Sequence, residues 1–172
     1  MAVHEAGRLL SERSPKAEVH VVATCQEEIG IRGARTAAHR VDPAVAIAVD
    51  VTFATDHPGS VGSKSVQGDV SLGGGPVISR GANINPRLFD LLVRTAQDRE
   101  IPYQVIAEPA GTGTDAQSIQ VVRDGVATAL VSVPMRYMHT PCEMVSLTDI
   151  DRVARLLAHT VEAIEDADQF LL

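Results

Sequence analysis

The 172-residue sequence contains no tryptophan, and aromatic residues make up only 3% of it. So few aromatic side chains argue against a protein that stacks nucleobases on aromatic rings. Basic residues are also scarce, since 15 Lys and Arg stand against 22 Asp and Glu, giving a net charge of −7. A binder of phosphate backbones needs clustered Lys and Arg, so the composition predicts no nucleic-acid partner.

Cysteines and long apolar runs are lacking too. The two cysteines, Cys25 and Cys142, are too few for a disulfide scaffold and are interpreted as reduced thiols. No apolar run approaches the roughly 20 residues that span a bilayer. The first residues show neither the apolar core nor the cleavage site of a signal peptide. We therefore expect a cytoplasmic protein with no membrane partner.

The remaining composition is that of a folded domain, with 45% hydrophobic and 22% charged residues. The length corresponds to a single domain. Short apolar runs, each predicted to be a strand, alternate with segments of helical spacing. The clearest strands are Val19–Cys25, which we expect to be buried on both faces, Ala44–Phe53, Pro102–Glu108 and Val126–Val133; helices are expected over 2–13 and 32–39, after Asn85 and after Ser146. This alternation predicts an α/β domain with a mostly parallel sheet.

Acidic residues and a histidine follow several of these strands. Glu27 and Glu28 come directly after the first strand, and Asp50 lies near the end of the second. His139 follows the last strand by a few residues. Open α/β sheets place their ligand sites at the carboxyl ends of the strands, so the four side chains are expected to converge. Asp50 is the most informative, because a carboxylate inside an apolar strand is costly unless it is paired or coordinated.

Two carboxylates and an imidazole suit a divalent cation such as Zn²⁺, Co²⁺ or Mn²⁺. Adjacent glutamates on extended backbone point in opposite directions. One of them can therefore bind metal while the other serves as a general base. Each residue also has a non-functional interpretation: a pair of glutamates is commonly solvent-exposed at an edge or helix start, and His139 can be an ordinary histidine of a surface loop. The conjunction of the four favours a site.

The other motifs are less specific. The turns at Gly73–Gly75 and at 111–116 (GTGTDA) are rich in glycine, but neither matches a phosphate-binding or dinucleotide-binding pattern. No serine has the context of a hydrolase nucleophile. A nucleophile built from Cys142 and His139 stays open as an alternative.

Five segments, in this order, resemble the M42 family of metallo-aminopeptidases, the glutamyl and tetrahedral aminopeptidases once also described as endoglucanase M. They are VVATCQEEIGIRGA, AVAIAVDVTFATDHPG, LGGGPVISRG, GTGTDA and VSVPMRYMHTPCEMVSLTDI. The resemblance extends from about residue 3 to about residue 164. It implies a three-layer α/β/α catalytic domain like that of other zinc exopeptidases, with a small dimerisation domain inserted. It also implies a peptide substrate cleaved at its N-terminus, two divalent metals, Zn or Co, and a homo-oligomer.

The resemblance also assigns roles to residues. Glu27 would be the general base that activates the attacking water, and Glu28, Asp50 and His139 would be metal ligands. The residues that would contact the substrate are Gly113, Thr114, Asp115 and Arg136. Arg136 and Glu143 would in addition support the loop that carries His139.

The sequence departs from the family pattern in its first part. Two metal ligands, a histidine after an early strand and an aspartate in a D-[DN]-[RK]-x-G motif, have no counterpart, and the N-terminal strands and the inserted domain of the family would have preceded residue 1. The resemblance thus implies that residues 1–172 are a single, partial catalytic domain, weakly active or inactive as given. The alternative is a non-catalytic α/β module of the same ancestry that binds a partner.

Overall fold

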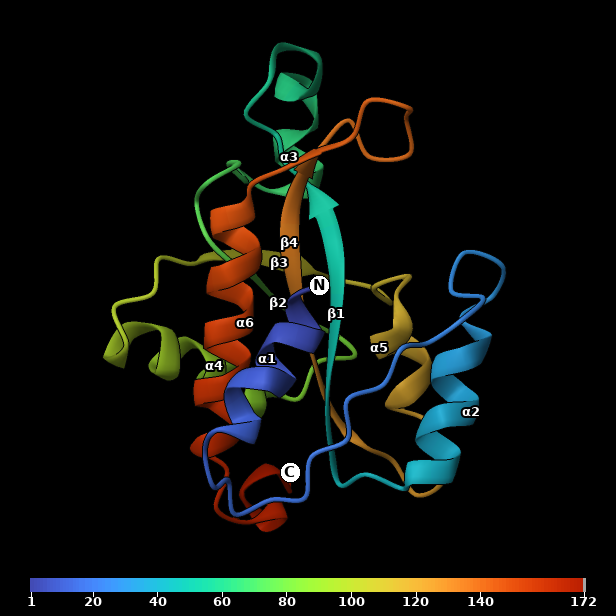
Figure 1. Cartoon of the computed structure of the whole chain (residues 1–172). Helices are drawn as coiled ribbons and strands as arrows, with labels where there is room; N and C mark the ends of the chain where they lie inside the picture. Colours follow the sequence, from blue (N-terminus) through green and yellow to red (C-terminus); the bar gives the residue numbers. More distant parts are fainter. Residues whose placement is uncertain (172) are drawn as a thin grey trace.

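The computed structural model describes residues 1–171, in which a sheet lies between two layers of helices (Figure 1). Within these residues the sheet has five strands in the order β1–β4–β2–β3, and β5 pairs with β4. The strands are β1 (Val45–Phe53), β2 (Val77–Gly81), β3 (Gln104–Glu108), β4 (Ala127–Arg136) and β5 (Met144–Val145).

The longest pairings in the sheet are parallel. β1 runs beside β4 from Val45 opposite Ala127 to Phe53 opposite Met135, and β2 runs parallel to β3. The pairings of β4 with β2 and β5 are short and antiparallel. The predicted α/β class with a mostly parallel sheet is therefore confirmed.

Helices cover both faces of the sheet (Figure 1). One layer contains α1 (Ala2–Ser11), α4 (Pro86–Asp98) and α6 (Leu147–Glu162), and the other contains α2 (Arg32–Val41) and α5 (Asp115–Ile119). Short helical turns lie at η1 (Pro58–Ser63), α3 (Lys64–Gln67) and η2 (Ala167–Phe170). This is the expected three-layer α/β/α arrangement. No helix among residues 1–171 has the length and apolar character needed to cross a membrane.

Two of the helices begin where their sequence signals predict. The Asn85 side chain accepts hydrogen bonds from the N–H groups of Arg87 and Leu88, and Pro86 occupies the first turn of α4. The Ser146 hydroxyl accepts from the N–H of Asp149 at the start of α6. Both caps satisfy N–H groups that a helix leaves without an internal partner.

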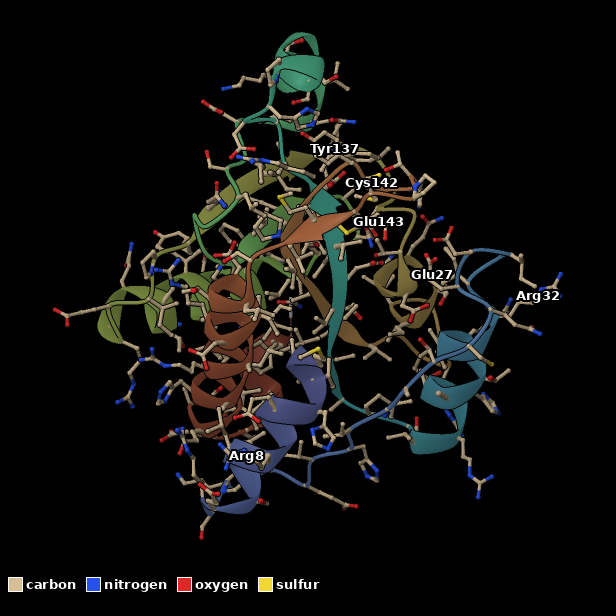
Figure 2. All side chains as sticks on the ribbon, turned by 45° about the horizontal axis from the view of Figure 1, so that its top comes forward. Arg8, Glu27, Arg32, Tyr137, Cys142 and Glu143 are labelled. Atoms are coloured by element: carbon tan, nitrogen blue, oxygen red, sulfur yellow. The ribbon has the colours of Figure 1, made fainter. Side chains whose placement is uncertain are left out.

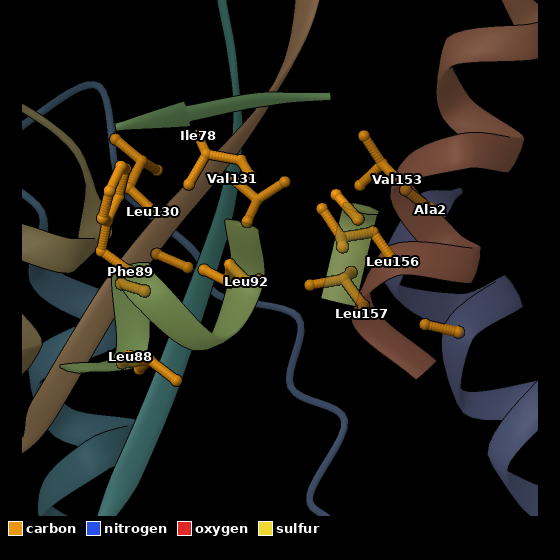
Figure 3. Close-up of a cluster of buried hydrophobic side chains, with 14 of the residues drawn as sticks. Ala2, Ile78, Leu88, Phe89, Leu92, Leu130, Val131, Val153, Leu156 and Leu157 are labelled. Carbon is orange, nitrogen blue, oxygen red and sulfur yellow. The ribbon is translucent and has the colours of Figure 1, made fainter. Parts of the chain in front are cut away.

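The main core lies between the sheet and the layer of α1, α4 and α6, as Figure 3 shows. Leu88 and Leu92 from α4 and Leu156 from α6 meet Ile78 of β2 and Val131 of β4 there, all with at most a trace of exposure. Burying one such side chain is worth about 2 kcal/mol relative to leaving it in water. This side of the sheet therefore supplies most of the apolar stabilisation.

The strand expected over Val19–Cys25 is wrong. These residues form no ladder, and all of them are exposed rather than buried on both faces. A strand exists only through hydrogen bonds to a neighbour, and within residues 1–171 no strand lies close enough to provide them. The segment instead runs as a coil along the side of β1 that faces away from β4 (Figure 1).

Candidate active site

The predicted site residues come from three separate segments. Glu27 and Glu28 lie in the turn before α2, Asp50 lies in the second half of β1, and His139 lies in the loop after β4. Figure 2 shows Glu27, Cys142 and Glu143 toward the same end of the molecule, with Arg8 at the opposite end. The turn, the strand end and the loop thus meet at one edge of the sheet, as the sequence predicts.

A tight turn positions Glu27. Its carbonyl oxygen accepts from the N–H of Ile31 at 2.9 Å, and Gln26 and Ile31 both have positive φ angles, of 60° and 53°. The turn closes through a 2.9 Å hydrogen bond from the N–H of Gly33 to the carbonyl of Cys25. A Cβ at position 33 would lie 2.3 Å from that carbonyl oxygen, so only glycine fits there. The strained backbone and the close approach fix where the glutamate pair leaves the chain.

Asp50 is half-buried in the parallel ladder, opposite Ser132 of β4. One of its carboxylate oxygens accepts from the N–H of Val51 at 2.8 Å. Burial raises the pKa of Asp50, the hydrogen bond from Val51 lowers it, and the negative charges of Asp115 and Glu28 raise it further. Asp50 is therefore a desolvated carboxyl group with other carboxylates nearby.

His139 contacts Glu28 directly. Its Nε2 lies 3.3 Å from Oε1 of Glu28, and its ring meets the Phe53 ring edge-on, with the centroids 6.5 Å apart. The residue has a positive φ of 61°, and its N–H donates to Oε1 of Glu143 at 2.8 Å. The predicted support of the loop by Glu143 is thus present as a hydrogen bond to the backbone of His139.

Glu27 faces the same cluster. Burial raises the pKa of its carboxyl group, and the charges of Asp50, Glu28 and Asp115 raise it further, whereas His139 lowers it. Four carboxylates close enough to repel one another concentrate negative charge at this edge. Such a cluster attracts cations and is typical of functional sites.

The donor types at this edge fit a divalent cation, because imidazole nitrogen and carboxylate oxygen both bind Zn²⁺ and Co²⁺. In residues 1–171, however, no three His, Cys, Asp or Glu side chains are grouped closely enough to hold a metal ion. Among the candidate ligands at this edge, Glu28 and His139 are in direct contact. The described chain therefore supplies a partial set of donors.

The glycine-rich loop before α5 lies beside this cluster. Asp115 begins α5, and one of its carboxylate oxygens accepts a 2.6 Å hydrogen bond from the hydroxyl of Thr24. Its other oxygen is buried and has no hydrogen-bond partner in the described chain. Gly113 has a positive φ of 67°, and the Thr114 hydroxyl bonds to that of Thr112 at 2.8 Å. Contact of this loop with a substrate stays a prediction.

Arg136 points its guanidinium group at a partner that the sequence did not suggest. It donates to both carboxylate oxygens of Asp56, at 2.8 and 2.7 Å. This bidentate pair holds the pKa of Asp56 below its ordinary value. Arg136 therefore ties the segment after β1 to the end of β4, and its proposed contact with a substrate stays untested.

Sequence reasoning missed Thr24 and Asp56. Each makes its contact with a residue at least 80 positions away in the chain, so no local spacing announces either pair. Cys25 and Cys142 are both free and exposed, as their interpretation as reduced thiols requires.

The α/β/α fold is shared with solved aminopeptidases. The TET aminopeptidase of Thaumarchaeota archaeon SCGC AB-539-E09, from marine sediment, superposes with a TM-score of 0.88 at 29% identity, over 99% of this chain and 48% of that chain. The TET1 peptidase of Pyrococcus horikoshii superposes with a TM-score of 0.67 at 29% identity, over 82% of this chain and 40% of that chain.

Residues 1–156 match the model of the M42 glutamyl aminopeptidase family, and the chain belongs to that family. A curated relative, the lysyl aminopeptidase of Pyrococcus furiosus, is 44% identical over 167 residues, which are 97% of this chain and 46% of the relative. The chain thus spans about half the length of the curated relatives it matches. The resemblance found in the sequence is confirmed.

Proposed function

We propose that this chain carries catalytic residues of a metal-dependent aminopeptidase, a hydrolase that releases N-terminal residues from peptides. The observation that carries the proposal is the convergence of Glu27, Glu28, Asp50 and His139 at one sheet edge in a member of the M42 family. The names of the relatives describe them as aminopeptidases, and a peptide substrate for this chain is part of the proposal.

Glu28, Asp50 and His139 would hold the divalent metal, with Zn or Co as the best match to these donors. When bound, the cation would polarise the scissile carbonyl group. The family resemblance implies two metals per site. Such a site needs more ligands than residues 1–171 bring together. The proposed site is therefore complete only with donors beyond this set.

Glu27 would act as the general base. Its carboxylate would take a proton from the attacking water and pass it to the leaving amine. A base works best when its pKa lies near the working pH, and both burial and the neighbouring carboxylates raise the pKa of Glu27 in that direction. The tight turn before α2 would hold this base in a fixed place beside Glu28.

The loop over Gly113, Thr114 and Asp115 would line the substrate cleft. The buried carboxylate oxygen of Asp115 that has no partner within residues 1–171 can accept a hydrogen bond from the substrate. Arg136 would chiefly support the loop that carries His139, because its Nε and one terminal guanidinium nitrogen donate to Asp56.

The assembly and location of the protein are parts of the same proposal. The Pyrococcus horikoshii TET1 peptidase can assemble into a tetrahedron or a large octahedral shell, which supports a homo-oligomer for the protein that contains this domain. We further propose that residues 1–172 form one partial catalytic domain of a cytoplasmic enzyme.

The test of the proposed function is Glu27→Gln in the chain extended upstream to the length of its relatives. Removal of the base should lower the release of N-terminal residues from peptides by about 10²–10⁴-fold while metal binding persists. Glu100→Gln, an exposed position outside the site, is the matched control and should leave activity unchanged. Equal activity in the Glu27 variant would exclude it as the base. No activity in any extended form would favour the alternative, a non-catalytic module.

A further inference from the structure

A short hydrogen bond joins Thr24 to Asp115. The Thr24 hydroxyl donates to Oδ2 of Asp115 at 2.6 Å, and the two residues are 91 positions apart in the sequence. This length is typical of a hydroxyl that donates to a charged carboxylate, and such bonds are about twice as strong as those between neutral groups. The contact therefore fixes one of the two carboxylate oxygens of Asp115.

The segment that carries Thr24 leads directly into the glutamate turn. The backbone of residues 19–24 makes no hydrogen bond to another backbone group of the described chain, so the Thr24 side chain supplies a contact that the backbone does not. Glu27 follows three residues later, in the turn that the hydrogen bond from Gly33 to Cys25 closes. The contact thus joins the start of this turn to the start of α5.

Asp115 adds negative charge to the candidate metal site. Burial is the first cause of the raised pKa of both Asp50 and Glu27, and the charge of Asp115 raises the pKa of each further. Charges act on one another in this way only when they lie close together. A carboxylate beside other carboxylates also attracts cations to them. Asp115 can therefore strengthen cation binding without touching the cation.

The second carboxylate oxygen of Asp115 lacks compensation. Oδ1 is buried and has no hydrogen-bond partner within residues 1–171. Burial of a charged oxygen without a partner is costly, and a cation held by the neighbouring side chains would offset that cost. Rotation of the carboxylate to bring Oδ1 to solvent would break the 2.6 Å bond from Thr24. Thr24 therefore opposes the rotation that would move this charge.

We propose that Thr24 is a positioning residue, which holds the Asp115 carboxylate where its charge strengthens cation binding at the candidate metal site. The inference rests on the proposed function and adds to it a pair of residues that are not among the proposed ligands. Groups outside the ligand set change metal affinity about 10–100-fold when they are removed. Because Asp115 acts through its charge rather than through a bond to a ligand, we expect an effect at the lower end of this range.

The experiment measures Zn²⁺ affinity by competition with a chromophoric chelator, in the chain extended upstream to the length of its relatives. Asp115→Asn removes the charge and should weaken binding about tenfold. Thr24→Val keeps the size of the side chain and removes the hydroxyl, and it should weaken binding about fivefold, because the charge stays nearby but loses its fixed place. Thr24→Ser retains the hydroxyl and should bind like the parent.

A double variant shows whether Thr24 acts through Asp115. Once Asp115→Asn has removed the charge, Thr24→Val should have no further effect, so the two losses should not add. Two controls make the same chemical changes at exposed positions outside the site. Thr148→Val at the start of α6 and Asp124→Asn, which alters the net charge equally, should both bind Zn²⁺ normally.

Three results would overturn the inference while leaving the proposed function intact. The first is Zn²⁺ binding by Thr24→Val at the parent's affinity. The second is an equal loss in Thr24→Ser, which would assign the effect to shape rather than to the hydroxyl. The third is a Thr24→Val loss that persists in full beside Asp115→Asn. Failure of the extended parent chain to bind Zn²⁺ is a different result, because it would overturn the proposed metal site and this inference with it.

Discussion

Two regions at opposite edges of the sheet have similarly apolar sequences, but only one of them is buried. On the side of β4, β2 and β3, apolar residues pack against α4 and α6, and Leu92, Leu156 and Val131 are fully buried. On the side beyond β1, the equally apolar segment 19–25 lies exposed, separated from the strand by a cavity. The candidate active site lies between these two regions, with His139 on the packed side and the Glu27–Glu28 turn on the open side.

The difference shows that an apolar pattern specifies a strand only together with a neighbour. The run 126–133 forms β4 because β1 and β2 flank it, whereas Val19–Cys25 has the same character and no flanking strand. In a sheet, a strand buries its apolar side chains and pairs its backbone at the same time, and an apolar segment without a neighbouring strand does neither.

Leu92→Ala should give the largest effect on the packed side. Leu92 is 0% exposed in the core beneath the sheet, so the cavity left behind should lower the free energy of unfolding by about 3 kcal/mol. Val22→Ala, on the open side, should change it by less than about 0.5 kcal/mol. Urea unfolding of both variants measures the contrast, and equal losses would show that segment 19–25 is buried in solution.

Asp149→Ala should have the next largest effect. Asp149 is 0% exposed, and its carboxylate accepts from the N–H groups of Gly73 and Gly75 at 2.7 and 2.9 Å. Its loss leaves these N–H groups without their acceptor and should cost about 2–3 kcal/mol in urea unfolding. Asp151→Ala, exposed on the same helix, is the control. A loss no larger than the control's would mean that solvent replaces the carboxylate.

Arg136→Met should lower the urea midpoint by a smaller amount that depends on pH. The pKa of Asp56 is held below its ordinary value of 3.8, so the pair stabilises the fold above that pH and stops doing so as the pH falls through the lowered pKa. The gap between variant and parent should be constant from pH 7 to about pH 4 and shrink below it. Arg94→Met, an exposed control, should show no such trend, and a gap that persisted at low pH would contradict the assignment.

Glu28→Gln should have the smallest effect on stability. The Glu28 and His139 side chains are 76% and 65% exposed, and exposed ion pairs contribute only about 0–1 kcal/mol. We expect a change within about 0.5 kcal/mol in urea unfolding, together with loss of metal affinity. A large loss of stability would mean that the contact is structural rather than a place for a ligand.

Sequence patterns predicted the features that depend on local spacing. Asn85 and Ser146 mark their helix starts through their own side chains, and Asp50 is conspicuous because it interrupts an apolar run. Asp50 in β1 and His139 after β4 lie near each other because these two strands are paired and parallel, whereas the segment before Glu28 forms no strand, so the same rule does not account for the Glu28–His139 contact. The order of the strands, the failure of segment 19–25 to pair, and the Thr24–Asp115 and Arg136–Asp56 contacts depend on distant neighbours, which spacing does not encode.

The central claim is that Glu28, Asp50 and His139 act together as metal ligands, and the most direct measurement is a calorimetric titration of this chain with Zn²⁺ and Co²⁺. We expect binding that Asp50→Ala abolishes and that Asp90→Ala, an exposed aspartate of α4, leaves unchanged. Binding that survives Asp50→Ala at full affinity would contradict the claim.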